Sequence, residues 1–253
     1  MTKTQTAESV GAKEKLIVAL DVETAGEARR LFDALRDAAG MFKVGSQLFT
    51  AEGPDFVRSL AGAGARVFLD LKFHDIPNTV ASAAREAVRL GVALFNVHAS
   101  GGVEMMRRAA DATAEEAARL GASKPNVIAV TVLTSIDART LSETGVEVES
   151  VESHVRRLAR LADASGLDGV VASPHEIVPV RESVERDGFL VVTPGVRPAR
   201  AAHDDQKRVQ TPAEAVRAGA DFIVVGRAIL NAPDPARAAR EIVEEMEKAC
   251  SGQ

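Results

Sequence analysis

The sequence predicts an α/β protein, a single-domain (β/α)8 barrel of the TIM type. Eight short aliphatic or β-branched runs recur along 253 residues, separated by Ala-, Arg- and Glu-rich stretches with helical spacing. Runs that are apolar throughout are typical of parallel strands covered by helices on both faces. No Pro/Gly/Ser-rich linker divides the chain. Eight units fit a closed barrel better than an open doubly wound sheet, which normally needs fewer strands.

Each expected strand is defined by its apolar run, beginning with KLIVALDV and ending with FIVVG. The eight strands are expected, in order, at residues 15–22, 42–45, 66–71, 94–99, 126–133, 169–173, 189–195 and 222–226.

The stretches between the strands carry helix signals. AGEARRLFDALRDAA and HVRRLARLADASG have helical spacing. In TPAEAVRAGA, Thr211 is the expected N-cap, Pro212 the first helical residue and Glu214 its capping-box partner, and the helix closes on Gly219. We expect residues 1–13 to form a flexible polar tail and residues 14–253 to form the catalytic barrel.

Composition narrows the class of protein. A net charge of -5 argues against nucleic acid or an anionic membrane surface as the main partner. The apolar runs are too short to span a bilayer and the N-terminus lacks a signal-peptide core, so a cytoplasmic protein is expected. The single cysteine, Cys250, has no partner for an internal disulfide or a zinc site.

Polar or small residues follow most of the expected strands. In barrels of this type the carboxyl ends of the strands carry the active site. The strand-end residues are Asp21, Lys43, Asp70, Lys72, Asn96, His98, Thr134, Ser135, Ser173, Gly226 and Arg227.

The stretch VFLDLKFHDIPNTV places Asp70, Lys72 and Asp75 directly behind an apolar run. Asp70 and Lys72 are two positions apart, so on an extended strand they point to one face. An isolated Asp–Lys pair on a strand is as readily a structural ion pair as a functional one. Lys43, on the neighbouring strand, favours a functional array, because several opposed charges are costly to desolvate for stability alone.

Metal and nucleotide-loop motifs are missing from the sequence. His74 and His98 lack metal-site spacing such as H-E-x-x-H, so a structural role is expected for each. Neither GxxxxGK[ST] nor GxGxxG occurs, and ATP and dinucleotides are therefore not indicated. We expect no metal.

A phosphate site is expected after the last two strands, at VTPGVRP and VVGRAI. Gly226 would let the backbone approach the anion, and Arg227 would bind its oxygens. Arg197 and Gln206 flank a polar loop that is either a lid or an ordinary surface loop.

These motifs together resemble the orotidine 5'-phosphate decarboxylase family. ALDV, FKVGSQLFTAEGP, VFLDLKFHDIPNT, NVHASGG, VTVLTS, LDGVVAS, VTPGVRP, DDQ and VVGRAI follow in order from about residue 15 to 245. DLKFHDIPNT is the most specific of them. The resemblance implies a carboxy-lyase that makes UMP and CO2 in the last step of de novo pyrimidine synthesis, with no cofactor.

The resemblance also assigns roles to individual residues. Lys43, Asp70, Lys72 and Asp75 would form an alternating charged tetrad, with Lys72 protonating C6. Asp75, Ile76 and Thr79 would reach the site of a second subunit, which implies a homodimer with shared sites. The implied substrate contacts are Asp21 and Lys43 to ribose, Thr134 to the pyrimidine, Gln206, Gly226 and Arg227 to phosphate, and Arg197 near the lid.

Two other functions stay open at this point. Metal-dependent sugar-phosphate decarboxylases or aldolases share a D-x-K-x-x-D pattern on similar barrels. A non-catalytic phosphate-binding barrel would keep Gly226 and Arg227 but would not need the charged tetrad.

Overall fold

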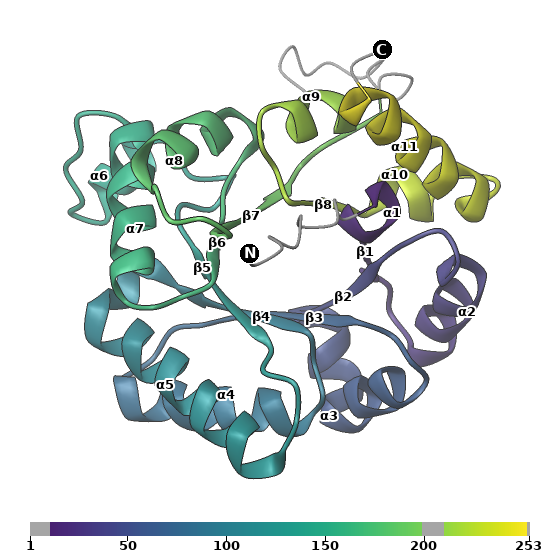
Figure 1. Cartoon of the computed structure of the whole chain (residues 1–253), viewed down its shortest axis with the longest axis horizontal. Helices are drawn as coiled ribbons and strands as arrows, with labels where there is room; N and C mark the ends of the chain where they lie inside the picture. Colours follow the sequence, from purple (N-terminus) through teal and green to yellow (C-terminus); the bar gives the residue numbers. More distant parts are fainter. Residues whose placement is uncertain (1–10, 199–209, 252–253) are drawn as a thin grey trace, which may run out of the picture.

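Eight parallel strands close into a barrel in the computed structural model, which describes residues 11–198 and 210–251. Helices surround the barrel on its outside (Figure 1). Parallel pairing of β8 with β1 closes it, and the predicted (β/α)8 fold is confirmed. The strands are β1 (Leu16–Ala19), β2 (Met41–Gly45), β3 (Val67–Phe73), β4 (Leu94–His98), β5 (Asn126–Val130), β6 (Gly169–Val171), β7 (Leu190–Pro194) and β8 (Phe222–Val225).

The longer helices have one buried apolar face each, which packs on the barrel. The helices are α1 (Ala12–Lys15), α2 (Ala25–Leu35), α3 (Ser46–Gly62), α4 (Pro77–Arg89), α5 (Gly102–Leu120), α6 (Ala138–Glu143), α7 (Val151–Ala164), α8 (Ile177–Ser183), α9 (Pro212–Arg217), α10 (Arg227–Leu230) and α11 (Pro235–Cys250), with 3-10 turns η1 (Ala99–Gly101) and η2 (Pro174–Glu176). In the described ranges none of these helices is both long and apolar enough to cross a membrane.

Several strands end earlier than the sequence predicted. β1 ends at Ala19 rather than residue 22, and β5 ends at Val130 rather than residue 133. Asp21 and Thr134 therefore lie in the loops that follow these strands. Loops can aim side chains across the barrel mouth, whereas strand residues are fixed by the pleat.

The N-terminal boundary also differs from the expectation. Helix α1 begins at Ala12, inside the expected tail of residues 1–13, and Ala12 is buried. Gly40 allows this packing, because a Cβ at that position would lie 2.4 Å from the Cα of Glu14. Residues 1–10 of the expected tail lie outside the described residues.

The predicted capping box at the start of α9 is confirmed. Thr211 Oγ1 accepts from the backbone N–H of Glu214 at 3.2 Å, and Glu214 Oε2 accepts from the N–H of Thr211 at 2.8 Å. The helix ends at Arg217, and Gly219 follows with a φ of 108° that favours glycine.

The apolar core has two parts separated by the barrel wall. The larger part lies between strands and helices, and the smaller part fills the barrel interior. Ile17, Met41, Phe68 and Leu94 belong to the interior part. Because side chains alternate along a strand, the residues two positions after Met41, Phe68 and Leu94 face the same interior, nearer the carboxyl ends.

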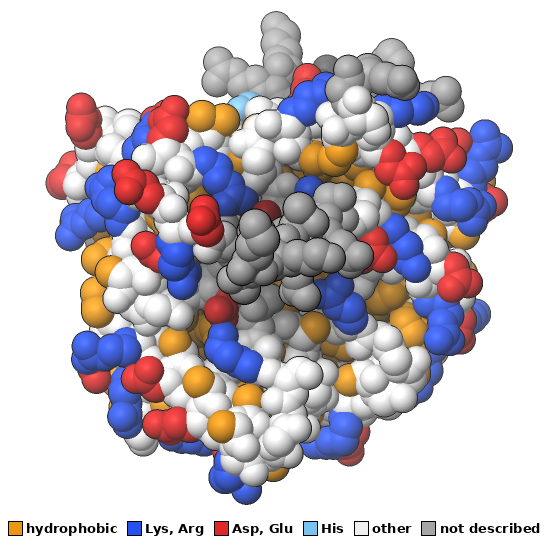
Figure 2. Space-filling view, in the orientation of Figure 1, with side chains coloured by type: hydrophobic (Ala, Val, Ile, Leu, Met, Phe, Trp, Pro, Cys, Tyr) orange, Lys and Arg blue, Asp and Glu red, His pale blue; other side chains and the backbone are white. Residues whose placement is uncertain are grey.

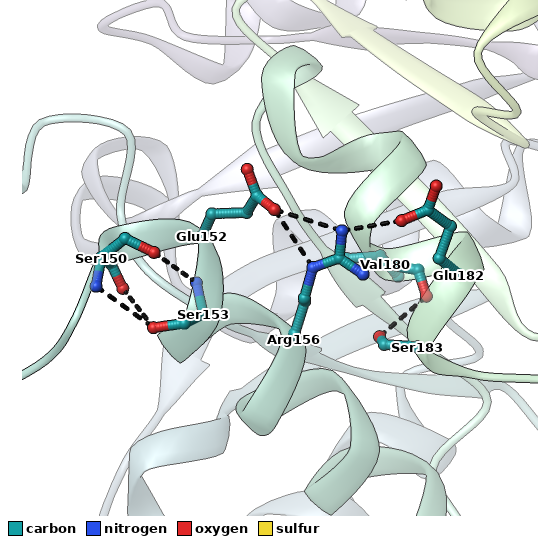
Figure 3. A network of polar contacts seen from close by, with 7 residues as sticks. All are labelled: Ser150, Glu152, Ser153, Arg156, Val180, Glu182 and Ser183. Carbon is teal, nitrogen blue, oxygen red and sulfur yellow. Dashed lines mark hydrogen bonds and ion pairs between the residues drawn. The ribbon is translucent and has the colours of Figure 1, made fainter.

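Polar contacts join the outer helices α7 and α8 (Figure 3). Arg156 Nη2 on α7 lies 2.7 Å from Glu182 Oε2 on α8 and 3.1 Å from Glu152 Oε1. Ser150 and Ser153 form a capping box at the start of α7. Ion pairs this exposed contribute about 0.2–1 kcal/mol, so this network is a minor stabiliser.

Charges of both signs are interspersed over the surface. On the face seen in Figure 2, basic and acidic side chains alternate around the outer helices. A surface that binds nucleic acid would instead gather basic side chains on one side. That face therefore gives no indication of a nucleic-acid partner.

Helices α4 and α5 are joined through Glu116, whose side chain is only 4% exposed. Its oxygens accept from Arg119 Nε at 2.8 Å, Arg119 Nη2 at 2.7 Å and Arg89 Nε at 2.7 Å. Hydrogen bonds from Arg119, then from Arg89, lower the pKa of Glu116 from 4.5 to about 2.

We expect Glu116→Gln to lower the melting temperature by several degrees at neutral pH, because Arg119 and Arg89 lose the charge of the buried carboxylate that they share. A depressed pKa stabilises the folded state above the unfolded value of 4.5, and this contribution is lost as pH falls toward about 2. The difference from wild type should therefore shrink on acidification. Thermal melts across that range measure it. Glu115→Gln is the control, since Glu115 is exposed and lies 3.4 Å from Arg85. A difference independent of pH would contradict the assignment.

Candidate active site

The carboxyl-terminal halves of β2, β3 and β4 bring polar side chains into the barrel mouth. Lys43, Asp70 and Asn96 follow the interior residues Met41, Phe68 and Leu94 by two positions each. All three are buried, with residue exposures of 8%, 9% and 1%. A layer of polar groups therefore lies directly on the apolar interior of the barrel.

Asp70 lies between two lysines. Its Oδ1 is 2.6 Å from Lys72 Nζ, and its Oδ2 is 3.3 Å from Lys43 Nζ. Lys43 Nζ also lies 2.8 Å from Oδ1 of Asp21, which is near the start of the loop between β1 and α2. The structure thus brings together three members of the predicted tetrad and links them to Asp21.

The electrostatics keep Asp70 ionised. Burial acts to raise its pKa, but the positive charges of Lys43 and Lys72, with hydrogen bonds from Lys72 and Asn96, hold that pKa below its usual value of 3.8. At neutral pH a carboxylate therefore stands beside two ammonium groups in a largely desolvated mouth.

Gly45 gives this array its space. A Cβ at Gly45 would lie 3.0 Å from Lys43 Nζ and 3.2 Å from Asp21 Oδ1. Any larger residue would press on the Lys43–Asp21 ion pair. Gly45 was not predicted as a site residue, because a glycine at the end of a strand is also common in ordinary turns.

Asp75, Ile76 and Thr79 lie at the start of α4, beyond the end of β3. All three are exposed, and Ile76 is 67% exposed although it is a large apolar residue. Asp75 Oδ1 accepts from the N–H of Ile76 at 2.6 Å, and Asp75 forms no ion pair with any described residue. A hollow of about 330 Å³, lined in part by Lys72, Asp75 and Thr79, opens here. Within the described residues of one chain, Asp75 thus lines the same hollow as Lys72 without pairing with it.

A second hollow lies where β1 and β8 meet. Its volume is about 550 Å³, and Asp21, Glu27, Arg30, Arg227 and Asn231 are among its lining residues. Gly226 precedes the short helix α10, with its Cα facing Ala19 and Asp21 closely enough that a Cβ would touch both. Arg227 and Asp21 thus face one space.

The remaining predicted site residues are placed less fully. Thr134 is exposed in the loop after β5, on the same rim as the other strand ends. Arg197 is half-buried, and its backbone N–H donates to Gln210 O at 3.3 Å. Gln206 and the rest of the segment 199–209 lie outside the described residues.

His74 and His98 lie near the array with ring centroids 5.4 Å apart. Burial, then the neighbouring His74 and Lys72, lowers the pKa of His98, so this ring is neutral at neutral pH. In residues 11–198 and 210–251 no three His, Cys, Asp or Glu side chains gather as a metal-binding group.

A closed (β/α)8 barrel with paired lysine and carboxylate groups at the carboxyl ends of its strands has the architecture of a barrel enzyme that acts on a small molecule. The model of the orotidine 5'-phosphate decarboxylase / HUMPS family matches residues 14–242. The chain belongs to this family.

Curated relatives and solved structures agree with this. The chain is 57% identical to the orotidine 5'-phosphate decarboxylase of Moorella thermoacetica over 237 residues, 93% of each protein. It is 57% identical to that of Geobacter sulfurreducens over 93% of this chain and 97% of the relative. The crystal structure of orotidine 5'-phosphate decarboxylase from Lactobacillus acidophilus superposes with a TM-score of 0.81 at 38% identity, covering 91% of this chain and 98% of that one.

Proposed function

We propose that this protein decarboxylates orotidine 5'-phosphate to UMP and CO2, the last step of de novo pyrimidine synthesis, without a cofactor. The observation that carries the proposal is Asp70 held between Lys43 and Lys72 at the barrel mouth. The family membership supplies the substrate. Residues 14–253 would act as one catalytic domain in the cytoplasm.

Fixed charges of the protein would stabilise the charge that develops on the substrate. Loss of CO2 leaves negative charge on C6 of the pyrimidine, and a pre-positioned ammonium stabilises such charge in a desolvated site. Lys72 would supply that ammonium and then protonate C6. Asp70 would repel the substrate carboxylate: like charges about 4 Å apart repel by about 4 kcal/mol at a dielectric constant of about 20, and forming neutral CO2 relieves this.

Binding at a distance would contribute the rest. Enzymes lower barriers by up to roughly 23 kcal/mol, far more than one repulsion supplies. Arg227, Gly226 and Gln206 would receive the phosphate, and this binding energy would fix the ring against the charges. Asp21 and Lys43 would hold the ribose hydroxyls, Thr134 the pyrimidine, and Arg197 would lie near the lid expected at 196–206.

The same proposal includes a homodimer. The exposure of Asp75, Ile76 and Thr79 beside the hollow at Lys72 supports it, because it leaves all three side chains accessible to a second subunit. The partner subunit would bring its Asp75 to the Lys72 of this chain and complete the tetrad.

The test is release of CO2 from orotidine 5'-phosphate, followed with the loss of pyrimidine absorbance. We expect full turnover in excess EDTA, since charge stabilisation by Lys72 requires no added ion. Loss of activity in EDTA, restored by Mg²⁺, would instead point to a metal-dependent sugar-phosphate enzyme. Binding of the nucleotide without CO2 release would point to a non-catalytic phosphate-binding barrel.

A further inference from the structure

Asn96 makes two hydrogen bonds that join the backbone and the side chains of the charged array. It lies in β4, is 1% exposed and faces the barrel interior. Its Nδ2 donates to Asp70 Oδ1 at 2.7 Å, and its Oδ1 accepts from the backbone N–H of Lys72 at 2.8 Å. The two ends of one buried amide thus hold two adjacent parts of β3.

The backbone of Lys72 needs such a support. Its φ is 53°, and among the described residues no other non-glycine has a positive φ. This conformation is strained for a residue with a long side chain, and strain of this kind persists only where the surroundings impose it. The pairing of β3 with β4 shifts register between Leu69 and Phe73, so the regular ladder is interrupted at this point. The Lys72 N–H donates to the side-chain Oδ1 of Asn96 rather than to a backbone carbonyl of the neighbouring strand.

The other end of Asn96 orients the Asp70 carboxylate. Oδ1 of Asp70 accepts from both Asn96 Nδ2 and Lys72 Nζ, and Oδ2 faces Lys43 Nζ. With one donor fixed by a strand of the barrel, the carboxylate plane cannot turn freely. Asn96 therefore holds both the backbone of Lys72 and the carboxylate of Asp70. Together these two contacts set the direction in which the Lys72 side chain approaches Asp70.

We propose that Asn96 is a positioning residue for the decarboxylation, setting the geometry of Lys72 and Asp70 without itself contacting the nucleotide. The inference rests on the proposed function. Displacement of a reacting group by about 1 Å costs up to about 10²-fold in rate. The effect of losing Asn96 should thus fall on kcat and leave binding of the phosphate, at β8, unchanged.

The test is Asn96→Leu, which keeps the volume and removes both hydrogen bonds. We expect kcat per UMP-binding site to fall about 10- to 100-fold, with KM and the UMP dissociation constant within about 3-fold of wild type. Asn96→Ala serves as the second variant if the leucine disturbs packing. Thr113→Val is the control: Thr113 is fully buried on α5, away from the barrel mouth, and its hydroxyl donates to Ala109 O at 2.7 Å.

The outcomes separate cleanly. A lower melting temperature with unchanged kcat would show that Asn96 only stabilises the barrel, and a raised KM with unchanged kcat would show that it binds the nucleotide; either result overturns the inference. An equal loss of kcat in Thr113→Val would do the same, since loss of any buried polar group would then suffice. Absence of CO2 release from the wild type would instead refute the proposed function.

Discussion

Lys72→Ala is expected to reduce turnover by roughly 10⁴-fold or more while UMP still binds, since both the proton donor and a transition-state charge are removed. Lys72 Nζ lies 2.6 Å from Asp70 in the mouth, and its side chain is 34% exposed, which leaves it accessible to a ligand. Arg227, which we propose to bind the phosphate, lies on α10 after β8 rather than on β3, so UMP binding should survive. Absorbance kinetics give the rate and calorimetry gives the UMP affinity.

Lys124→Ala is the matched control for this variant. Lys124 is paired with Asp168 at 2.8 Å and precedes β5, at the opposite rim of the barrel. It should keep wild-type kcat. A near-normal rate in Lys72→Ala would eliminate Lys72 as the proton donor.

Mixing the two inactive variants Lys72→Ala and Asp75→Asn is expected to restore activity. If Asp75 serves the partner's site, a mixed dimer has one site with both residues intact and one with neither. After complete exchange about half of the dimers are mixed, so about a quarter of wild-type activity should return. The recovered rate, measured against time of mixing, should follow subunit exchange.

The control for this experiment is Lys72→Ala mixed with the double variant Lys72→Ala/Asp75→Asn, in which no site contains Lys72. Activity must stay at background there. Proven subunit exchange without recovery in the first mixture would mean that Asp75 does not act across an interface, and that the exposure of Ile76 has another cause.

The barrel was predictable because its strands are buried on both faces, which forces continuous apolar runs into the sequence. The Asp70–Lys72 contact was also predicted, but the reasoning assumed an extended strand. The structure reaches the contact through a positive φ at Lys72, which no periodicity reveals. Asn96 was noted only as a strand-end residue, since its value depends on a shifted register that the chain order does not show.

Boundaries were less predictable than elements. The apolar runs continue past the last ladder bonds of β1 and β5, so hydrophobicity alone extended both strands by three residues. Ala12 was assigned to a polar tail because its neighbours are polar, whereas its burial comes from contacts of α1 with the distant α11 and β8.

Pairing of β8 with β1 ties the last strand of the chain to the first. A nascent chain that ends before β8 has β1 and β7 as unpaired edge strands, which can pair with other chains. Contacts between residues so far apart in sequence also form slowly, because a long loop must close before they are gained. Closure of the barrel therefore comes late in folding. Because Arg227 directly follows β8, a partly synthesised chain exposes unpaired edge strands that can aggregate before its proposed active site is complete.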